Sequence, residues 1–287
     1  MKLFEIKDHE PSLLPKGKNW KLAWADEFDG TELDTQKWGY RLNFWGFRAE
    51  QYTDQGVSLD GKGNVVFRPV VVDGRLCSAQ LQTGALTYDQ LDFEGAIKNR
   101  LARSIGDNPW GEIELWPFKP LIQPKFMHRY GYYEARVKFQ KRPFWWSAFW
   151  IQCPNTGSTC DPATSGVECD IVENFCDGQL TSGGIYGGYG KDFHDDEARI
   201  HYPYTEDGEF HRVGMEWSPE GYVYYFDGKE VTRSAGPVSH TDQFILLSTE
   251  IKGYRNGIIP TEFSEEDLAD CFVADYVRVF DAIEENE

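Results

Sequence analysis

The sequence predicts an all-β protein, a sandwich or barrel of short antiparallel strands. Segments with the alternating apolar pattern of half-buried strands recur at 64–67, 132–139, 147–152, 168–173, 211–216, 222–226, 244–248 and 272–280. Turn signals lie between them, at Asp60-Gly61, Asp73-Gly74, Pro219-Glu220-Gly221 and Asp227-Gly228. Strong helical periodicity is nearly absent. Regularly spaced short strands joined by turns are typical of antiparallel sandwiches and barrels.

The rest of the chain fits a single domain that spans residues 1–287. Asp227-Gly228 closes a hairpin from 222–226 onto Glu230-Val231, and 264–269 predicts one short turn of helix. The stretch 88–124 mixes charged, Gly, Pro and aromatic residues without clear alternation. We interpret it as decoration of the fold, although parts of it could pair as further strands. No internal repeat, low-complexity tract or linker-like break divides the chain.

The composition describes an acidic chain with enough apolar residues for a sizeable core. Of the 287 residues, 40% are hydrophobic and 15% are aromatic, and the formal net charge is −18. A field of this sign repels nucleic acid and anionic membrane surfaces, so we expect neither as a partner. Residues 1–20 lack the features of a signal peptide. This predicts a cytoplasmic chain as written, or a secreted one if the sequence is a trimmed form.

The six cysteines, at positions 77, 153, 160, 169, 176 and 271, are too few for a disulfide scaffold in a chain of this length. None forms a CxxC pair or lies near a histidine at zinc-binding spacing. We therefore interpret most of them as free thiols. Cys153 and Cys160 bracket a loop rich in Gly, Ser and Thr, and the sequence leaves open a disulfide between them in an oxidising compartment.

Three acids stand within six residues of an otherwise apolar segment, at Glu168, Asp170 and Glu173. Side chains alternate along a strand, so Glu168 and Asp170 share one face. Regular alternation would turn Glu173 to the opposite face. A β-bulge around Ile171-Val172 adds one residue and returns Glu173 to the acidic face. We therefore predict a bulge there.

Three carboxylates on one face repel one another, and this unfavourable repulsion suggests that the acids serve a function. Retaining glycosidases need one carboxylate as nucleophile and a second carboxyl as acid and then base, about 5–5.5 Å apart. In this interpretation Glu168 is the nucleophile, Glu173 the acid/base, and Asp170 a helper that orients and tunes Glu168. For the isolated pattern, an exposed edge strand or a calcium-binding acid cluster is an equally good explanation.

The wider setting of these acids resembles glycoside hydrolase family 16, whose signature is ExDxxE on a strand. The similarity extends from about residue 20 to 281. Its other segments are Trp24–Gly30 with Leu33-Asp34 and Lys37-Trp38, Tyr130–Arg136, Trp146–Trp150, Phe210–Trp217, Tyr225–Gly228 and Asp275–Val279. After the acid strand, where many laminarinase-like members carry a His-Gly pair, this chain has Ile185-Tyr186-Gly187.

The resemblance implies a β-jelly-roll sandwich of two curved antiparallel sheets with a substrate cleft on the concave face. It implies retaining endo-hydrolysis of a β-linked polysaccharide or oligosaccharide, in the bulged branch that includes laminarinases, agarases and carrageenases. It places the nucleophile at the first glutamate and the acid/base at the second. The reaction requires no cofactor, and we expect a monomer.

Sugar rings stack on flat apolar side chains, with polar groups at the rims. The candidate platforms are Trp45, Trp145, Trp146 and Trp150, of which Trp146 and Trp150 share one face of a strand; core burial is the alternative, and for Trp150 it is as strong. Further substrate-binding candidates are Arg48, Glu50, Tyr186 and His194. A solvent-facing loop residue is the stronger alternative for His194.

Family members often bind calcium on the convex side, and the matching positions here are Glu27 and Asp275. Backbone carbonyls and water would have to complete such a site, because calcium takes six to eight oxygen ligands. An ordinary solvated acidic pair is the competing explanation. A structural Ca²⁺ at this pair is therefore an expectation that the structure can test.

A neutral β-1,3-glucan of the laminarin type is the substrate that best fits an acidic protein. A marine-type β-galactan (agarose, porphyran or carrageenan) is the alternative, because Arg41, Arg48, Lys141 and Arg142 could form a local positive patch. A non-catalytic carbohydrate-binding sandwich is the alternative of another class. Transfer to a sugar acceptor instead of water is a further outcome of the same chemistry.

Overall fold

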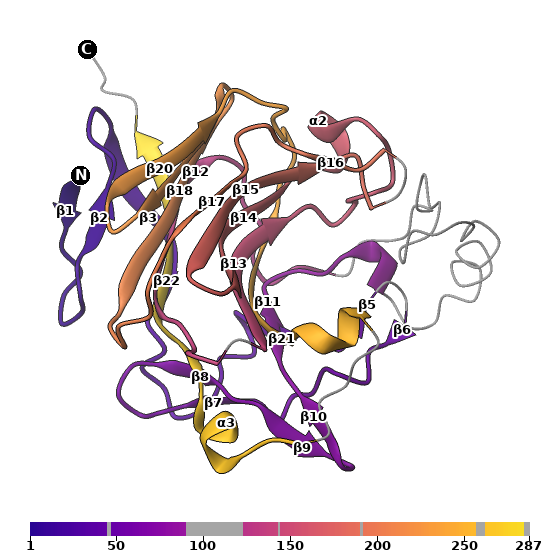
Figure 1. The fold of residues 1–287 in the computed structure, drawn as a ribbon. Helices are drawn as coiled ribbons and strands as arrows, with labels where there is room; N and C mark the ends of the chain where they lie inside the picture. The colour runs from indigo at the N-terminus through magenta and orange to yellow at the C-terminus, as the bar shows by residue number, and fades with distance from the viewer. Residues whose placement is uncertain (45–46, 90–122, 143, 190–191, 257–261, 284–287) are drawn as a thin grey trace.

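The structure is a computed structural model that describes residues 1–44, 47–89, 123–142, 144–189, 192–256 and 262–283. Two large antiparallel sheets pack face to face as a sandwich (Figure 1). The first, which we name the cleft sheet, has the strand order β16 (His194–Asp195), β15 (Gln179–Tyr186), β14 (Glu168–Cys176), β13 (Trp145–Gln152), β21 (Phe244–Ile251), β11 (Gln80–Gln82) and β4 (Gly39–Tyr40), with β17 (Ile200–Pro203) paired to β15. This confirms the predicted all-β class.

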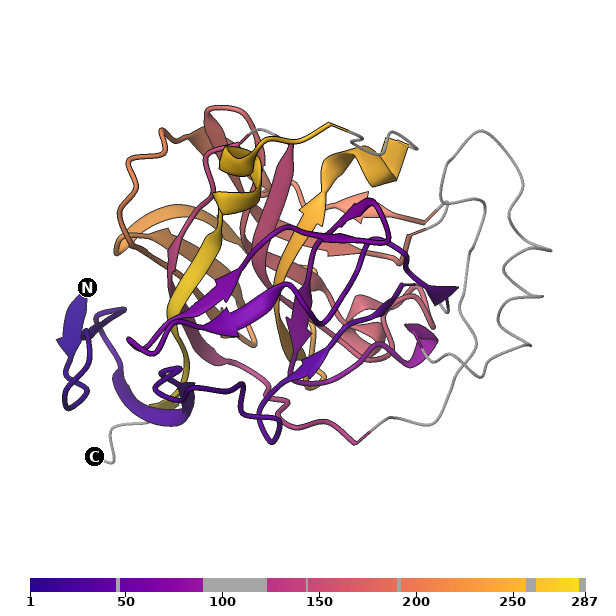
Figure 2. The same ribbon diagram turned by 90° about the horizontal axis from the view of Figure 1, so that it is seen from below.

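The second sheet, named the outer sheet, packs against the first across the core. Its strand order is β20 (Lys229–Ser234), β19 (Gly221–Phe226), β18 (His211–Ser218), β12 (Gly131–Lys138), β22 (Phe272–Ile283), β8 (Val65–Phe67) and β7 (Val57–Leu59), with β3 (Asn19–Asp26) paired to β22. Smaller pairs stand beside the two sheets: β1 (Lys2–Phe4) with β2 (Ser12–Leu14), β5 (Asn43–Phe44) with β6 (Phe47–Arg48), and β9 (Val70–Val72) with β10 (Arg75–Cys77). Figure 2 shows the sandwich from below.

Every segment predicted as a strand from alternation is a strand in the structure. Asp227 and Gly228 have φ values of 46° and 72°, so they form the two-residue turn that joins β19 to β20. The predicted helical turn is α3 (Glu265–Ala269), which Ser264 begins with a capping box. Within the predicted decoration 88–124, residues 90–122 lie outside the described part of the chain.

The strand β15 and the short helix α2 (Pro162–Ser165) are among the elements that escaped prediction. The strand β15 carries Gly183 and Gly184 where an alternating strand would show apolar side chains, so the pattern that identifies a strand is missing from its sequence. The helix α2 is a single turn, capped by the side chain of Asp161 and interrupted at once by Gly166. Its length is too small for a helical period to appear.

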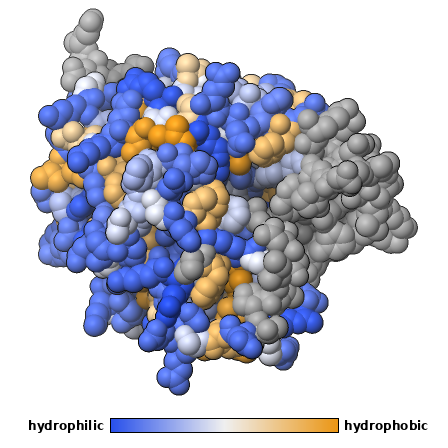
Figure 3. All heavy atoms as spheres, in the orientation of Figure 1, coloured by the Kyte–Doolittle hydropathy of each residue, from blue (hydrophilic) through white to orange (hydrophobic). Residues whose placement is uncertain are grey.

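The core lies between the two sheets and is built from their inward-facing side chains. From the cleft sheet it takes Phe149, Ile171 and Val172, and from the outer sheet Tyr133 and Val277, all of them at most 1% exposed. Side chains alternate along each strand, so the residues between these apolar ones point away from the core. In the cleft sheet, these outward positions carry the polar side chains. Most of the surface in Figure 3 is hydrophilic, with apolar residues in separate patches. The described helices are all too short to span a membrane.

The outer sheet is covered on its far side by the N-terminal segment, whose Leu14 and Trp20 pack with Tyr132 and Phe280. Polar groups are buried there too. The carboxylate of Glu134, which is 0% exposed, accepts hydrogen bonds from the backbone N–H of Leu13 and from the hydroxyl of Tyr276. Burial raises the pKa of Glu134 to about 7, against the effect of these hydrogen bonds.

The predicted calcium pair lies in this region, but its acids are already bound by arginines. Glu27 accepts two hydrogen bonds from Arg278, at 2.8 and 2.6 Å, and Asp275 accepts one from Arg136 at 2.7 Å. A guanidinium satisfies the carboxylate that calcium would need. The described residues contain no group of three or more acids, histidines or cysteines able to hold a metal, so the structure does not support the calcium expectation.

All six cysteines, Cys153 and Cys160 among them, are free thiols in the structure. Cys153 is buried and Cys160 is exposed. Burial raises the pKa of the Cys153 thiol to about 11. No disulfide therefore supports the loop between them.

Candidate active site

The predicted bulge is present in the acid strand. Phe149 of β13 pairs with Val172, while the next residue, Trp150, pairs with Asp170, so Ile171 is an extra residue without a partner on β13. Both Ile171 and Val172 turn into the core as a result. The bulge thereby returns the second glutamate to the outward face, as the mechanism required.

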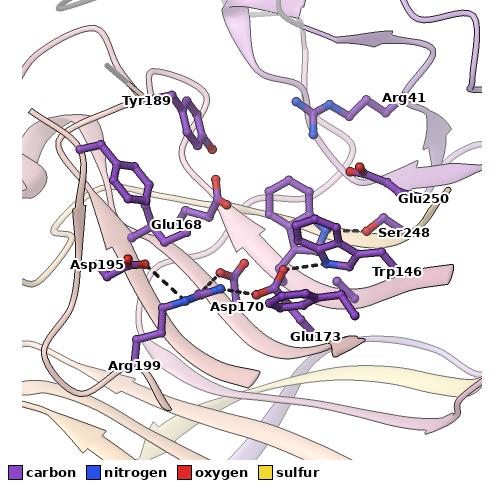
Figure 4. A pocket seen from close by; sticks show the side chains of 15 residues that line it. Arg41, Trp146, Glu168, Asp170, Glu173, Tyr189, Asp195, Arg199, Ser248 and Glu250 are labelled. Carbon is purple, nitrogen blue, oxygen red and sulfur yellow. Dashed lines mark hydrogen bonds and ion pairs between the residues drawn. The ribbon is translucent and has the colours of Figure 1, made fainter. Parts of the chain in front are cut away.

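Glu168, Asp170 and Glu173 line one cavity of about 240 Å³ on the outward face of the cleft sheet (Figure 4). The cavity wall combines acids, aromatic rings and two arginines. The other lining residues are Arg41, Trp146, Ala148, Trp150, Phe175, Ile185, Tyr189, Phe193, Asp195, Arg199, Ser248 and Glu250. Neighbouring strands of one sheet thus bring together residues that are far apart in the sequence.

Glu168 receives a hydrogen bond from the amide of Gln152. The donor Nε2 lies 2.8 Å from Oε2 of Glu168, and the same nitrogen lies 2.5 Å from the hydroxyl of Tyr189. Gln152 is fully buried, so its amide has a fixed position. An N–H donor favours the ionised carboxylate, which is the form that a nucleophile needs.

Both oxygens of Glu173 have donors. The indole Nε1 of Trp146 donates to Oε1 at 2.8 Å, and the guanidinium of Arg199 pairs with Oε2. Trp146 is itself held by stacking on Phe175, with ring centroids 4.5 Å apart. The side chain of Glu173 therefore has one defined orientation toward the cavity.

Asp170 lies between the two glutamates and shares Arg199 with Glu173. Burial raises the pKa of Asp170 well above its usual value, the charges of Glu173 and Glu168 raise it further, and Arg199 opposes them. Burial lowers the pKa of Arg199, but the two carboxylates outweigh burial and leave its pKa raised. Arg199 therefore carries a positive charge at neutral pH.

Of the predicted platforms, the structure brings Trp146 and Trp150 to the cavity. Trp150 is only 8% exposed and donates from its indole nitrogen to Ser248, with Arg41 over its ring, so little of its surface is open to a ligand. Trp145 lies on the other face of β13, where it packs against Leu76 and Ile251. Because side chains alternate along β13, Trp146 and Trp150 face the cavity together and Trp145 faces away from it.

The remaining candidates do not line the cavity within the described structure. Tyr186 and His194 stack on each other, with centroids 5.2 Å apart, and their neighbours Ile185 and Asp195 face the cavity instead. Glu50 is exposed and pairs with Arg75 on β10. Trp45 lies outside the described residues, and of Arg48 the structure describes the backbone alone.

Gln152, Tyr189 and Arg199 are among the contributors that the sequence did not identify. Gln152 stands in phase with Trp146 and Trp150 on one strand, so the alternation that grouped the tryptophans could have found it. Arg199 belongs to the loop between β16 and β17, and no pattern in that loop indicates its partner carboxylates. Only the folded chain connects it with the acid strand.

Comparison with known proteins agrees with this geometry. The sequence model of glycosyl hydrolases family 16 matches residues 86–250, more than half of the chain. Glucan endo-1,3-beta-glucosidase A1 of Niallia circulans is 25% identical over 284 residues, covering 90% of this chain and 37% of its own length. The glucan endo-1,3-beta-glucosidase of Cryptopygus antarcticus is 24% identical over 280 residues and is covered over 91% of its length.

Solved structures share the fold at lower identity. The endo-beta-1,3-glucanase of Pyrococcus furiosus superposes with a TM-score of 0.64 at 20% identity, with 98% of each chain covered. The laminarinase of Rhodothermus marinus gives 0.61 at 20% identity, with 94% of this chain and all of the other covered. The likeness confirms the jelly-roll sandwich.

Proposed function

The chain belongs to glycosyl hydrolase family 16, a family of retaining enzymes, and on that premise we propose that it hydrolyses internal β-1,3 bonds of a neutral β-glucan. One observation carries the proposal: the bulge at Ile171 presents Glu168, Asp170 and Glu173 together in one cavity. An edge strand with solvated acids would not bury Asp170 and Glu173 to 3% and 5% exposure.

The reaction follows from the contacts of the two glutamates. The Glu168 carboxylate attacks the anomeric carbon, the bond to the glycosidic oxygen breaks, and that oxygen takes a proton from Glu173. In the second step Glu173 accepts a proton from water as the water oxygen attacks the same carbon. Glu168 then leaves as a carboxylate, and Glu173 is again protonated. Asp170 stays within the acid strand and orients its neighbours.

The charge of the cavity wall supports a neutral sugar. Five carboxylates and two guanidiniums line it, and each guanidinium is paired with an acid: Arg41 with Asp89 at 2.7 Å, and Arg199 with Asp170 and Glu173. A sulfated galactan would meet net negative charge there. This argues against the sulfated β-galactans, porphyran and carrageenan, and leaves neutral agarose to be decided by the substrate comparison.

Two of the other basic residues considered for a positive patch, Lys141 and Arg142, lie elsewhere. Lys141 and Arg142 line a separate hollow of about 490 Å³. Their backbone N–H groups donate to Asp270, and the guanidinium of Arg142 pairs with Asp267. Neither residue faces the acids of the cleft, so they leave its negative balance unchanged. The names of the two curated relatives also support a 1,3-glucan.

Side-by-side incubation with laminarin, mixed-linkage glucan, agarose, porphyran and carrageenan tests the proposal. We expect reducing ends from laminarin, with products of several lengths from the start, because an endo-enzyme cuts internal bonds. Product masses separate hydrolysis from sugar transfer. Binding of a glycan without release of reducing ends would support the non-catalytic sandwich instead. Faster cleavage of a sulfated galactan than of laminarin would overturn the substrate.

A further inference from the structure

We propose that Gln152 and Tyr189 form a positioning pair for the nucleophile. In this pair the buried amide of Gln152 fixes the carboxylate of Glu168, and the hydroxyl of Tyr189 fixes that amide. The inference deepens the function proposed above and rests on the role given there to Glu168. Neither member of the pair takes part in bond breaking. Their part is to hold the carboxylate in one orientation toward the anomeric carbon.

Glu168 is the least buried of the three acids on its strand. Asp170 and Glu173 are 3% and 5% exposed, whereas Glu168 is only partly buried. Both buried acids are also held by the guanidinium of Arg199. A long side chain that solvent can reach loses its rotational freedom only when another group fixes it. A nucleophile in this setting depends on its hydrogen-bond donor for a single orientation.

The donor stands on the neighbouring strand. Ile151 of β13 pairs with Cys169 of β14, so Gln152 lies next to Glu168 across the two strands. Nε2 of Gln152 donates to Oε2 of Glu168 at 2.8 Å. Gln152 is 0% exposed and does not belong to the described lining of the cavity. It therefore acts on a sugar through Glu168 and not by touching the sugar.

The amide of Gln152 is turned so that its nitrogen serves two neighbours. Nε2 also lies 2.5 Å from the hydroxyl oxygen of Tyr189, so each of its two N–H groups has an acceptor. Oε1 of the same amide is buried and finds no hydrogen-bond partner in the described structure. The reverse orientation would place this oxygen against the carboxylate of Glu168, and two acceptors would repel each other. An unsatisfied buried oxygen is unfavourable, which indicates that the contact with Glu168 determines the orientation.

Tyr189 reaches the amide through a turn that contains two glycines. Gly187 and Gly188 follow β15 with φ values of 80° and 77°, a conformation that favours glycine. A Cβ on Gly187 would lie 1.8 Å from the carbonyl oxygen of Asp192. The chain therefore turns tightly after β15 and brings Tyr189 to the cavity wall, close to Glu168 (Figure 4).

This arrangement should affect kcat more than KM. Loss of the Gln152 amide leaves the surface that binds the sugar intact, because Gln152 is no part of it. A carboxylate that is free to turn forms the bond to the anomeric carbon more slowly, since the rate depends steeply on alignment of the reacting atoms. Tyr189 acts through Gln152, so the effect of its hydroxyl should depend on the presence of the amide.

The experiment is a double-mutant cycle of Gln152→Met and Tyr189→Phe, assayed on laminarin. Methionine has nearly the length and volume of glutamine and lacks the N–H donor. We expect Gln152→Met to lower kcat by about ten- to a hundred-fold, with KM within about two-fold of the wild type. Tyr189→Phe should lower kcat by about two- to ten-fold alone, and by less than about two-fold in Gln152→Met. Fully additive effects would overturn the pair.

Gln140→Met is the matched control. Gln140 is 4% exposed, and its amide donates to the backbone carbonyl of Asn174 at 3.4 Å. The change removes a buried amide of the same kind that does not contact Glu168, and kcat should stay at the wild-type value. A fall in kcat as large as in Gln152→Met would show that the loss of any buried glutamine disturbs the site, and would overturn the inference.

Covalent labelling reports on the nucleophile more directly. In an epoxyalkyl β-glycoside of laminaribiose, the carboxylate oxygen of Glu168 opens the epoxide to form an ester, and the epoxide oxygen takes up a proton. Intact-protein mass measures the labelling rate, with Glu168→Gln as the blank. The rate should fall in Gln152→Met by about the same factor as kcat.

The outcomes separate the inference from the proposed function. Unchanged labelling and unchanged kcat in a folded Gln152→Met protein would overturn the inference and leave the function standing. If Gln152→Met does not fold, Tyr189→Phe decides, because it removes only one hydroxyl from a loop; an unchanged kcat would then overturn the inference. A wild type that neither cuts laminarin nor is labelled would overturn the function and the inference together.

Discussion

The sandwich buries an arginine against carboxylates on each of its two outward faces, and the two clusters differ in charge balance. On the outer sheet, Arg278 is 0% exposed and directs Nε and Nη2 at Glu27 and Nη1 at the carbonyl of Glu10 and the hydroxyl of Ser12. One guanidinium meets one carboxylate, and the N-terminal segment covers both.

On the cleft sheet the balance is different. Arg199 meets Asp170 and Glu173 together, and Glu168 adds a third acid on the same strand. The excess of negative charge faces an open cavity instead of a covering segment. On the outer sheet, the pairing of arginine with carboxylate therefore stabilises the fold. On the cleft sheet, one arginine holds several mutually repelling carboxylates together, an arrangement that is typical of active sites.

The strongest test of this contrast is Glu168→Gln. It should lower kcat on laminarin by roughly a thousand-fold or more, because the nucleophile is lost. The thermal midpoint should stay equal or rise, since the change removes one of three repelling charges. A large fall in the midpoint would show that the acid strand is structural. Activity within about ten-fold of the wild type would contradict the role of Glu168.

Arg278→Met should give the opposite result. It leaves the partly buried carboxylate of Glu27 without its guanidinium partner, and we expect a loss of about 1–3 kcal/mol in the free energy of unfolding. The specific activity of the folded fraction should not change. Urea unfolding followed by tryptophan fluorescence measures the first quantity. Glu27→Gln in the same background should restore part of the loss, and no restoration would contradict the pairing.

Glu134, buried on the outer sheet, should make the free energy of unfolding depend on pH. Its pKa is about 7 in the folded protein and near 4.5 when unfolded, so the folded state binds the proton more tightly. Its stabilising contribution is complete below pH 4.5 and is lost as the pH rises through 7. The loss is at most roughly 3 kcal/mol. Unfolding free energies from pH 4.5 to 8 should show this decline, and Glu134→Gln should flatten it.

The smallest expected effect is on Trp146, whose indole nitrogen donates to Glu173. Trp146→Phe keeps a ring to stack on Phe175 and removes one hydrogen bond to a charged group, worth about 1.5–3 kcal/mol. We expect kcat to fall by roughly ten-fold or somewhat more, with little change in stability. Trp145→Phe, in the core beside Leu76, is the control. It should lower stability and leave kcat unchanged.

The sequence predicted the parts of the molecule that follow a local period. Alternation of apolar residues predicts the strands. The requirement that Glu173 face the cleft predicts the bulge. The missed parts depend on distant contacts. Arg199 and Tyr189 reach the cleft from loops, and the alternating pattern of β15 is broken by Gly184 and by Gly183, whose missing side chain leaves room for Arg199. The calcium expectation finds no support in the structure, because Arg278 and Arg136 donate hydrogen bonds to Glu27 and Asp275.

The bulge at Ile171 also determines how this site could change by a single codon. The extra residue enters the core, so its side chain adds to packing while the acids remain outside. Deleting the codon for Val172 would leave a regular strand in which the three acids stand at alternate positions and still share the outward face. Loss of one residue here would remove a core side chain and keep the catalytic face. Loss of one residue between Glu168 and Asp170 would turn a glutamate inward.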